Sequence, residues 1–131
     1  MCIFRSKEQP ELTESQKKWN RLWDNYSAGK LAETYPLVFL ICDYYSGVSG
    51  EGHSGWFFNT ENTYGQDALQ TTISALKEIL PADLSENLSH AYDSLGSENE
   101  DNICKKADEF FYEHEQKVTA VLQNYADNLS L

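Results

Sequence analysis

The chain has 131 residues, with 10 Lys or Arg against 21 Asp or Glu, so its formal net charge at pH 7 is −11. This length suffices for one domain whose hydrophobic core needs no disulfide or metal. The acidic balance argues against direct binding of nucleic acid or of an anionic membrane, because both require a basic surface. Basic proteins or cations are the complementary partners.

No segment is expected to cross a membrane or to direct secretion. The longest apolar run, Leu37–Cys42, is far shorter than the ~20 residues of a membrane span. Three widely spaced cysteines do not form a secreted disulfide framework, so a cytoplasmic location is expected. We expect Cys42 and Cys104 in the core, Cys2 as an exposed thiol, and neither a metal nor another cofactor.

The first predicted helix covers about residues 13–28. Its apolar residues recur at helical spacing, and Thr13 and Gln16 have the spacing of a capping box. Gly29 is a suitable residue for its end.

A second predicted helix covers about residues 30–45, with a kink or a new start expected at Pro36. The segment 47–65 follows, rich in glycine and aromatic residues and without helical periodicity. It is predicted to be a long loop. We expect its aromatic side chains to anchor that loop to the core, because rings left in water forfeit their burial; they are Trp56, Phe57 and Phe58.

Three further helices are predicted over about 66–80, 83–95 and 97–128, with Gly96 ending the second of them. No segment alternates with the period of two that a strand requires. The prediction is therefore all-α: residues 1–131 form a single-domain bundle of about five main helices with one long glycine-aromatic loop.

The residue patterns offer little catalytic chemistry. Residues 50–55 fit the pattern G-x-G-x-x-G, but a helix precedes them and aromatic residues follow, so a nucleotide site is rejected. A metalloprotease motif at His114 would need a second histidine where Val118 stands, so His114 is interpreted as a buried, hydrogen-bonded residue. His53 is the one titratable candidate in the loop, and no orienting carboxylate can be assigned to it from the sequence.

Acidic residues concentrate toward the end of the chain. Carboxylates three or four residues apart on a helix place negative charges about 5–6 Å apart, similar to the spacing of phosphates along a nucleic-acid strand. The more ordinary interpretation is a solvated helix face. The candidate partner-binding residues are Glu98, Asp101, Asp108, Glu109 and Glu113.

The run Gly52-His53-Ser54-Gly55-Trp56-Phe57-Phe58-Asn59-Thr60, together with the helices through residues 75–81 and 91–92, resembles the DNA-mimic-protein domain family. The resemblance covers about residues 30–95. It implies an acidic, all-helical protein whose motif residues are structural; these are Gly52, His53, Gly55, Trp56, Phe57, Phe58 and Asn59.

The resemblance favours a function as an acidic protein-binding module that occupies the DNA-binding surface of a basic protein. An alternative is an immunity- or antitoxin-like inhibitor of a toxin, which would use a similar acidic face. A third hypothesis is a small enzyme centred on His53, although the sequence assigns no other catalytic residues to act with it. A homodimer is left open by the sequence.

Overall fold

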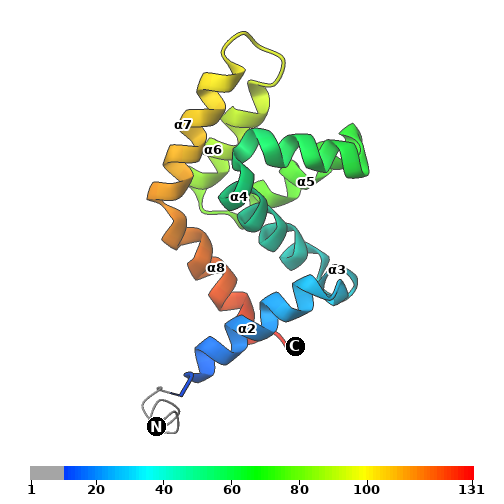
Figure 1. The fold of residues 1–131 in the computed structure, drawn as a ribbon, viewed down its shortest axis with the longest axis vertical. Helices are drawn as coiled ribbons and strands as arrows, with labels where there is room; N and C mark the ends of the chain where they lie inside the picture. Colours follow the sequence, from blue (N-terminus) through cyan, green and yellow to red (C-terminus); the bar gives the residue numbers. More distant parts are fainter. Residues whose placement is uncertain (1–10) are drawn as a thin grey trace, which may run out of the picture.

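The structure is a computed structural model that describes residues 11–131. Within that range it contains seven helices and no strand, which confirms the all-α prediction (Figure 1). The helices are α2 (Glu14–Ser27), α3 (Lys30–Thr34), α4 (Pro36–Tyr64), α5 (Gln66–Ile79), α6 (Ala82–Asp93), α7 (Glu100–Glu113) and α8 (Glu115–Asn128).

The helix ends with local sequence signals are where those signals predict them. Thr13 caps α2 in a complete capping box with Gln16. Gly29 follows α2 with φ 77°, in the left-handed region that glycine adopts without strain. Pro36 is the first residue of α4, where its missing N–H has no helical partner to lose, so the predicted new start is confirmed.

The predicted loop over residues 47–65 is wrong, because α4 continues through nearly all of it. Only Gly52 leaves helical geometry, with φ 73° and ψ 176°, and Figure 1 shows α4 changing direction. Two of the other glycines there, Gly47 and Gly55, allow close packing. A side chain on Gly47 would overlap the Trp56 indole, which the turn at Gly52 brings back against it. The glycine content of this segment is therefore no sign of a loop.

The predicted long helix over residues 97–128 is two helices, α7 and α8, which meet at His114. This residue has φ −113° and ψ 17°, outside regular helix. Its backbone N–H bonds to the carbonyl oxygens of both Phe110 and Phe111, and its Nδ1 lies 2.9 Å from the Phe110 oxygen. These bonds tighten the last turn of α7 and end it. With this break and the new start at Pro36, residues 11–131 hold seven helices where five were predicted.

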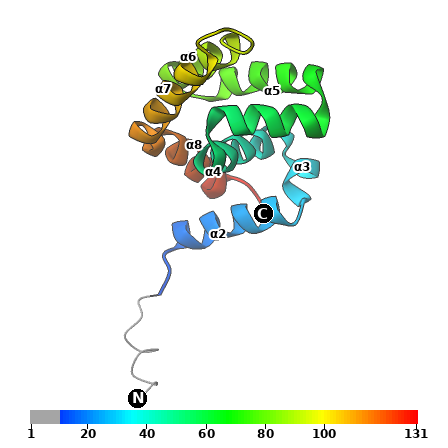
Figure 2. The same cartoon turned by 45° about the horizontal axis from the view of Figure 1, so that its top comes forward.

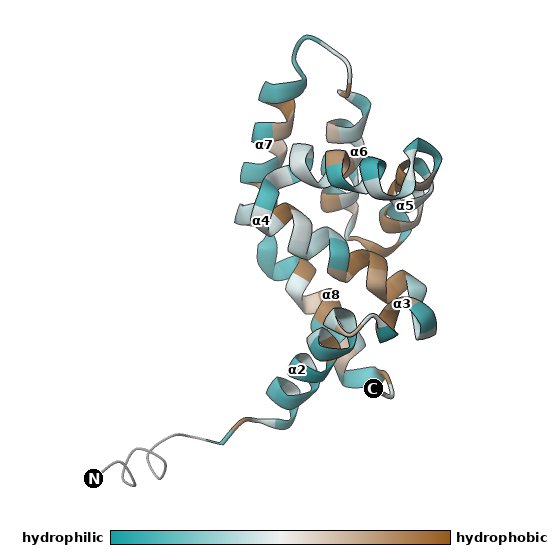
Figure 3. Ribbon diagram, turned by 45° about the vertical axis from the view of Figure 1, so that its right-hand side comes forward, coloured by the Kyte–Doolittle hydropathy of each residue, from teal (hydrophilic) through white to brown (hydrophobic). Residues whose placement is uncertain are grey.

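The long helix α4 lies at the centre of the packing. It packs against α5 and α7, α6 packs against both of these, and α2 packs against α8. Figure 2 shows the C-terminal end of the chain close to α2. In Figure 3 the helices carry both hydrophilic and hydrophobic residues, as expected of helices with one face toward the core and one toward water. The largest fully buried side chains are Tyr44, Phe57, Phe111, Leu22, Leu31, Ile41, Leu69, Leu76, Leu84, Leu88, Leu122 and His53.

The cysteine prediction is confirmed where the structure describes it: Cys42 and Cys104 are buried, unpaired core residues. The third, Cys2, lies outside the described residues. Among the helices of residues 11–131, none has both the length and the apolar character needed to cross a membrane.

Candidate functional site

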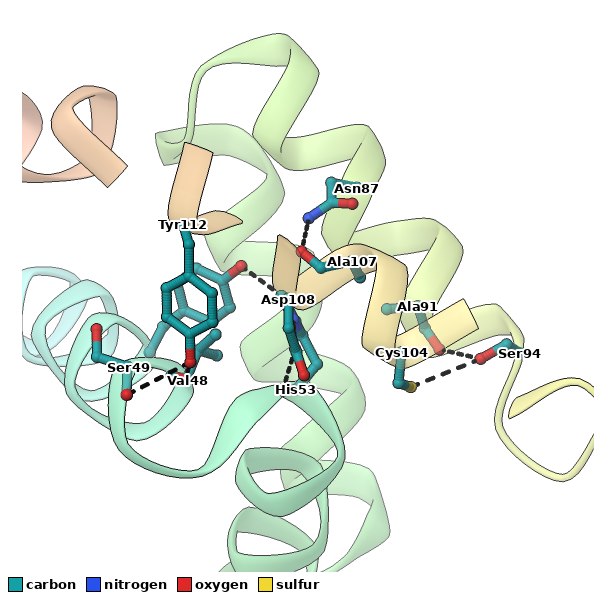
Figure 4. Close-up of polar contacts among 11 residues, drawn as sticks. Val48, Ser49, His53, Asn87, Ala91, Ser94, Cys104, Ala107, Asp108 and Tyr112 are labelled. Atoms are coloured by element: carbon teal, nitrogen blue, oxygen red, sulfur yellow. Dashed lines mark hydrogen bonds and ion pairs between the residues drawn. The ribbon is translucent and has the colours of Figure 1, made fainter. Parts of the chain in front are cut away.

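His53 is fully buried at the point where α4 turns. Its Nε2 lies 2.8 Å from the hydroxyl oxygen of Tyr44. Its Nδ1 lies 2.7 Å from Oδ1 of Asp108 on α7, and Figure 4 shows these two side chains facing each other. The same carboxylate oxygen accepts a second hydrogen bond, 2.7 Å long, from the backbone N–H of His53. Asp108 therefore holds both the ring and the backbone of His53.

The bonding pattern assigns the proton positions in this network. An ionised carboxylate only accepts, so Nδ1 of His53 donates to Asp108, and in the neutral imidazole Nε2 then accepts from the Tyr44 hydroxyl. Burial raises the pKa of Tyr44 well above its usual range, and the negative charge of Asp108 raises it further. The tyrosine hydroxyl thus remains protonated.

The predicted role of Asp108 on an exposed acidic face does not agree with its position. Its side chain is 26% exposed and is engaged with His53. It also lies against Gly52, where an added Cβ would come within 2.5 Å of its Oδ2. Asp108 is therefore a link between α4 and α7. A second link is the Tyr112 hydroxyl, which donates to the carbonyl oxygen of Val48 over 3.2 Å.

The other four predicted acidic residues are exposed. Within residues 11–131 none of them forms an ion pair or a side-chain hydrogen bond. They are Glu98, Asp101, Glu109 and Glu113. Two exposed lysines, Lys105 and Lys106, lie between them on α7 and offset part of the negative charge of that helix.

The motif segment is helical, and its three aromatic rings differ in exposure. Trp56 and Phe57 are buried, whereas Phe58 is 66% exposed and cannot be a core anchor. Phe58 follows Phe57 on a helix, so a turn of about 100° separates the two side chains. Asn59 is exposed and donates a hydrogen bond to Glu51, eight residues before it. Gly55 packs closely against the Glu51 side chain.

Sequence reasoning missed a groove between the second part of α4 and the turn that joins α6 to α7. Its volume is about 510 Å³. Its apolar lining includes Phe57, Phe58 and Leu95, and its acidic lining is Glu61, Glu100 and Asp101. We call it the Phe58 groove. An adjoining groove of about 410 Å³ shares Glu61 and Leu95 with it and adds Asp93.

One signal in the sequence points to this region. Residues 93–104 contain four acidic and no basic residues, which is the turn between α6 and α7 and its flanks. Glu61 carries no such signal, because only the packing of α4 brings it to that turn.

Several other carboxylates have structural partners. Asp43 accepts a hydrogen bond of 2.8 Å from the Tyr26 hydroxyl, and Glu115 accepts one of 2.7 Å from the Tyr45 hydroxyl.

Within residues 11–131 no three His, Cys, Asp or Glu side chains are grouped so that they could hold a metal ion. His114 is half-buried and stacks on Phe110, with ring centroids 4.0 Å apart.

Comparisons with known proteins give one relationship. No curated protein and no solved structure matched the chain. A family model described as DMP19-like protein matches residues 29–129, which is most of the chain and extends well beyond the region of resemblance identified from the sequence. The chain therefore belongs to the DMP19-like family of DNA mimic proteins.

Proposed function

We propose that this protein binds a basic protein through its exposed carboxylates and occupies the surface with which that partner binds DNA. Membership of the DMP19-like family supports this function. So does the net charge of −11, which attracts a basic surface and repels DNA itself.

The observation that carries the proposal is the set of exposed carboxylates without partners: Glu98, Asp101, Glu109 and Glu113. A carboxylate already paired with a lysine or a hydroxyl would have to give up that bond on association. An unpaired one exchanges only water, so it remains available to arginine or lysine of a partner.

The exposed carboxylates of α7 are spaced more widely than the phosphates of DNA. At a rise of ~1.5 Å per residue, Asp101 and Glu109 are about 12 Å apart along α7, and Glu109 and Glu113 about 6 Å. DNA presents a phosphate every ~3.4 Å along each strand, so the helix offers a sparser row of negative charge. Lys105 and Lys106 interrupt that row, and the turn between α6 and α7 has the denser uninterrupted charge.

The structure argues against the first alternative, a small enzyme, but does not separate the second, an immunity-like inhibitor, from a DNA mimic. His53 has both ring nitrogens bonded and no exposed surface, which gives an enzyme centred on it no access for a substrate. An immunity-like inhibitor would use the same acidic surface, and only the identity of its partner distinguishes it from a DNA mimic.

The test is to purify the partner on the immobilised protein and to measure its binding to DNA by fluorescence anisotropy as this protein is added. A DNA mimic displaces the DNA, because one basic surface serves both ligands. Changing Glu98, Asp101, Glu109 and Glu113 together to Lys should abolish both partner binding and displacement.

The matched control reverses four exposed carboxylates elsewhere, Glu11, Asp24, Glu33 and Glu78, and so has the same net charge. It should retain most of the affinity. Equal loss in both variants would mean that total charge, and not this surface, attracts the partner. A partner that binds DNA and this protein simultaneously would contradict mimicry and favour the inhibitor.

A further inference from the structure

The Phe58 groove combines an apolar floor with an acidic rim. Phe57, Phe58 and Leu95 supply the apolar part, and Glu61, Glu100 and Asp101 the acidic part. A ligand that fits both must have an apolar portion ending in a positive charge.

Phe58 itself is the unexpected residue in this groove. It is one of five large hydrophobic side chains that residues 11–131 expose, and 66% of it is open to water. Isolated exposed apolar residues need no explanation. This one lies in a concave site of about 510 Å³, where a partner side chain can cover it.

The charges around the groove are of one sign. No Lys, Arg or His lines it or the adjoining groove, and Asp93 adds a fourth carboxylate to the two sites together. Glu100 uses one oxygen for a 3.3 Å hydrogen bond from the backbone N–H of Gly96 and keeps the other for a ligand. Such a concentration of carboxylates is complementary to a cation.

The geometry favours an organic cation over a metal ion. Metal ligands must converge on one point at about 2–2.6 Å, and no such group of side chains exists within residues 11–131. A guanidinium group instead stacks on an aromatic face while its N–H groups bond to carboxylates around the edge. Arginine meets both conditions better than lysine, whose ammonium group is compact and strongly hydrated.

We propose that the Phe58 groove receives an arginine side chain of the basic partner, with the guanidinium on Phe58 and the carboxylates of Glu61, Glu100 and Asp101 around it. This inference rests on the proposed function and gives it a point of contact that binds by shape as well as by charge. Such an aromatic contact, desolvated on binding, would add affinity to that of the α7 carboxylates, since each surface ion pair by itself is weak.

The groove is tested first without the partner, by titrating the ¹⁵N-labelled protein with N-acetyl-arginine methylamide and recording amide shifts. We expect saturable, millimolar binding with the largest shifts at Ser54, Gly55 and Phe58. The neutral isostere N-acetyl-citrulline methylamide should bind at least tenfold more weakly. Equal shifts with both compounds, or shifts located elsewhere, would overturn the proposal.

Variants separate the groove from general acidity. Phe58→Ala should remove the arginine-induced shifts without changing the charge, and Asp101→Asn should weaken them. Tyr64→Ala is the matched control, because Tyr64 is 62% exposed and does not line this groove. It should leave the arginine titration unchanged. Retention of full arginine binding by Phe58→Ala would refute the assignment.

The purified partner then distinguishes failure of this inference from failure of the proposed function. Phe58→Ala should lower the affinity for the partner about tenfold, whereas the fourfold charge reversal abolishes binding. If the reversal abolishes binding and Phe58→Ala has no effect, the groove is not the point of contact and the function stands. If neither variant affects the partner, both proposals are wrong.

Discussion

His53 is a buried polar residue whose desolvation cost is offset by hydrogen bonds to all of its nitrogen atoms. Its two ring nitrogens and its backbone N–H are all bonded, to Tyr44 and to Asp108. Within residues 11–131 no buried side-chain nitrogen or oxygen lacks a partner. These hydrogen bonds therefore hold the turn of α4 in a fixed position against α7.

Replacing Asp108 with Ala should destabilise the fold. The change leaves the ring Nδ1–H and the backbone N–H of His53 without an acceptor, at about 1–3 kcal/mol for each unsatisfied buried donor. We expect urea unfolding to show a loss of roughly 2–6 kcal/mol. Glu109→Ala, the exposed neighbour, should change stability by less than about 0.5 kcal/mol. Similar values for the two variants would mean that the Asp108 bonds contribute nothing.

Phe57 and Phe58 provide a second comparison between adjacent residues. Phe57 is 2% exposed and packs against Trp56 and Tyr92, so Phe57→Ala should cost roughly 3–5 kcal/mol. Phe58→Ala removes an exposed ring and should cost about 0.5 kcal/mol or less. Thermal unfolding measures both. A large loss of stability in Phe58→Ala would show that its ring is packed and not available to a partner.

The sequence could not distinguish these pairs. Asp108 and Glu109 have the same charge, and Phe57 and Phe58 are identical side chains. Which member of each pair is buried depends on the rotation of its helix against α4 or α6. That rotation is set by contacts far apart in the sequence, such as the 55-residue separation between His53 and Asp108.

At the scale of elements, the glycines of α4 have opposite roles that can be measured. Gly52 has φ 73° and lies against Asp108, so Gly52→Ala should cost at least the ~1–2 kcal/mol of a left-handed alanine. Gly50 is helical, and an added Cβ there meets nothing within 4 Å. Gly50→Ala should stabilise the protein by about 0.5–1 kcal/mol.

Chemical denaturation of the two glycine variants provides the measurement. Opposite signs are expected because helix propensity decides the outcome at Gly50, while the backbone conformation decides it at Gly52. If both variants were destabilised equally, the region around Gly50 would not be the continuous helix that the structure describes.

The elements that could be predicted are those with local signals at their ends. The capping box at Thr13, the left-handed Gly29 and the start at Pro36 each act within one turn of the chain. The break at His114 has no such signal. Phe111 and Val118, seven residues apart, are both buried on either side of it, so the apolar repeat continues across the break.

At the scale of the whole molecule, the sequence predicts that the surface is acidic but not where its carboxylates come together. A net charge of −11 on a compact chain must lie mostly at the surface. The exposed positions of Asp101, Glu109 and Glu113 follow from their spacing relative to the apolar residues of α7. The Phe58 groove does not, because it joins Glu61 of α4 to Asp101 of α7.

The stability of the whole fold should fall at alkaline pH. Burial raises the pKa of the Cys42 thiol from 9.0 to about 12, and the nearby charge of Asp43 adds to the effect. Burial also raises the pKa of Tyr45 from 10.0 to about 12, with the Glu115 hydrogen bond as the next cause. Burial moves the pKa values of Tyr26 and Tyr44 upward as well.

These shifts determine the direction of the pH dependence. Between about pH 9 and 12 the unfolded chain has already released protons that the folded protein still binds, so rising pH favours unfolding. Stability should be complete below about pH 9 and should decline through pH 12. Each buried group contributes at most ~1.4 kcal/mol per pH unit, and partly exposed tyrosines contribute less. Urea unfolding at intervals from pH 7 to 11 measures the decline.

Cys42→Ala tests whether buried groups cause this decline. The substitution removes one group that titrates differently in the two states, while the small cavity that it leaves costs the same at every pH. Its stability should therefore be lower than that of the wild type at pH 7 but should fall less steeply above pH 9. If the slopes of the two proteins were the same, the Cys42 thiol would release its proton equally in the folded and unfolded states. The alkaline loss would then arise from the tyrosines alone, or from repulsion within a surface that already carries a net charge of −11.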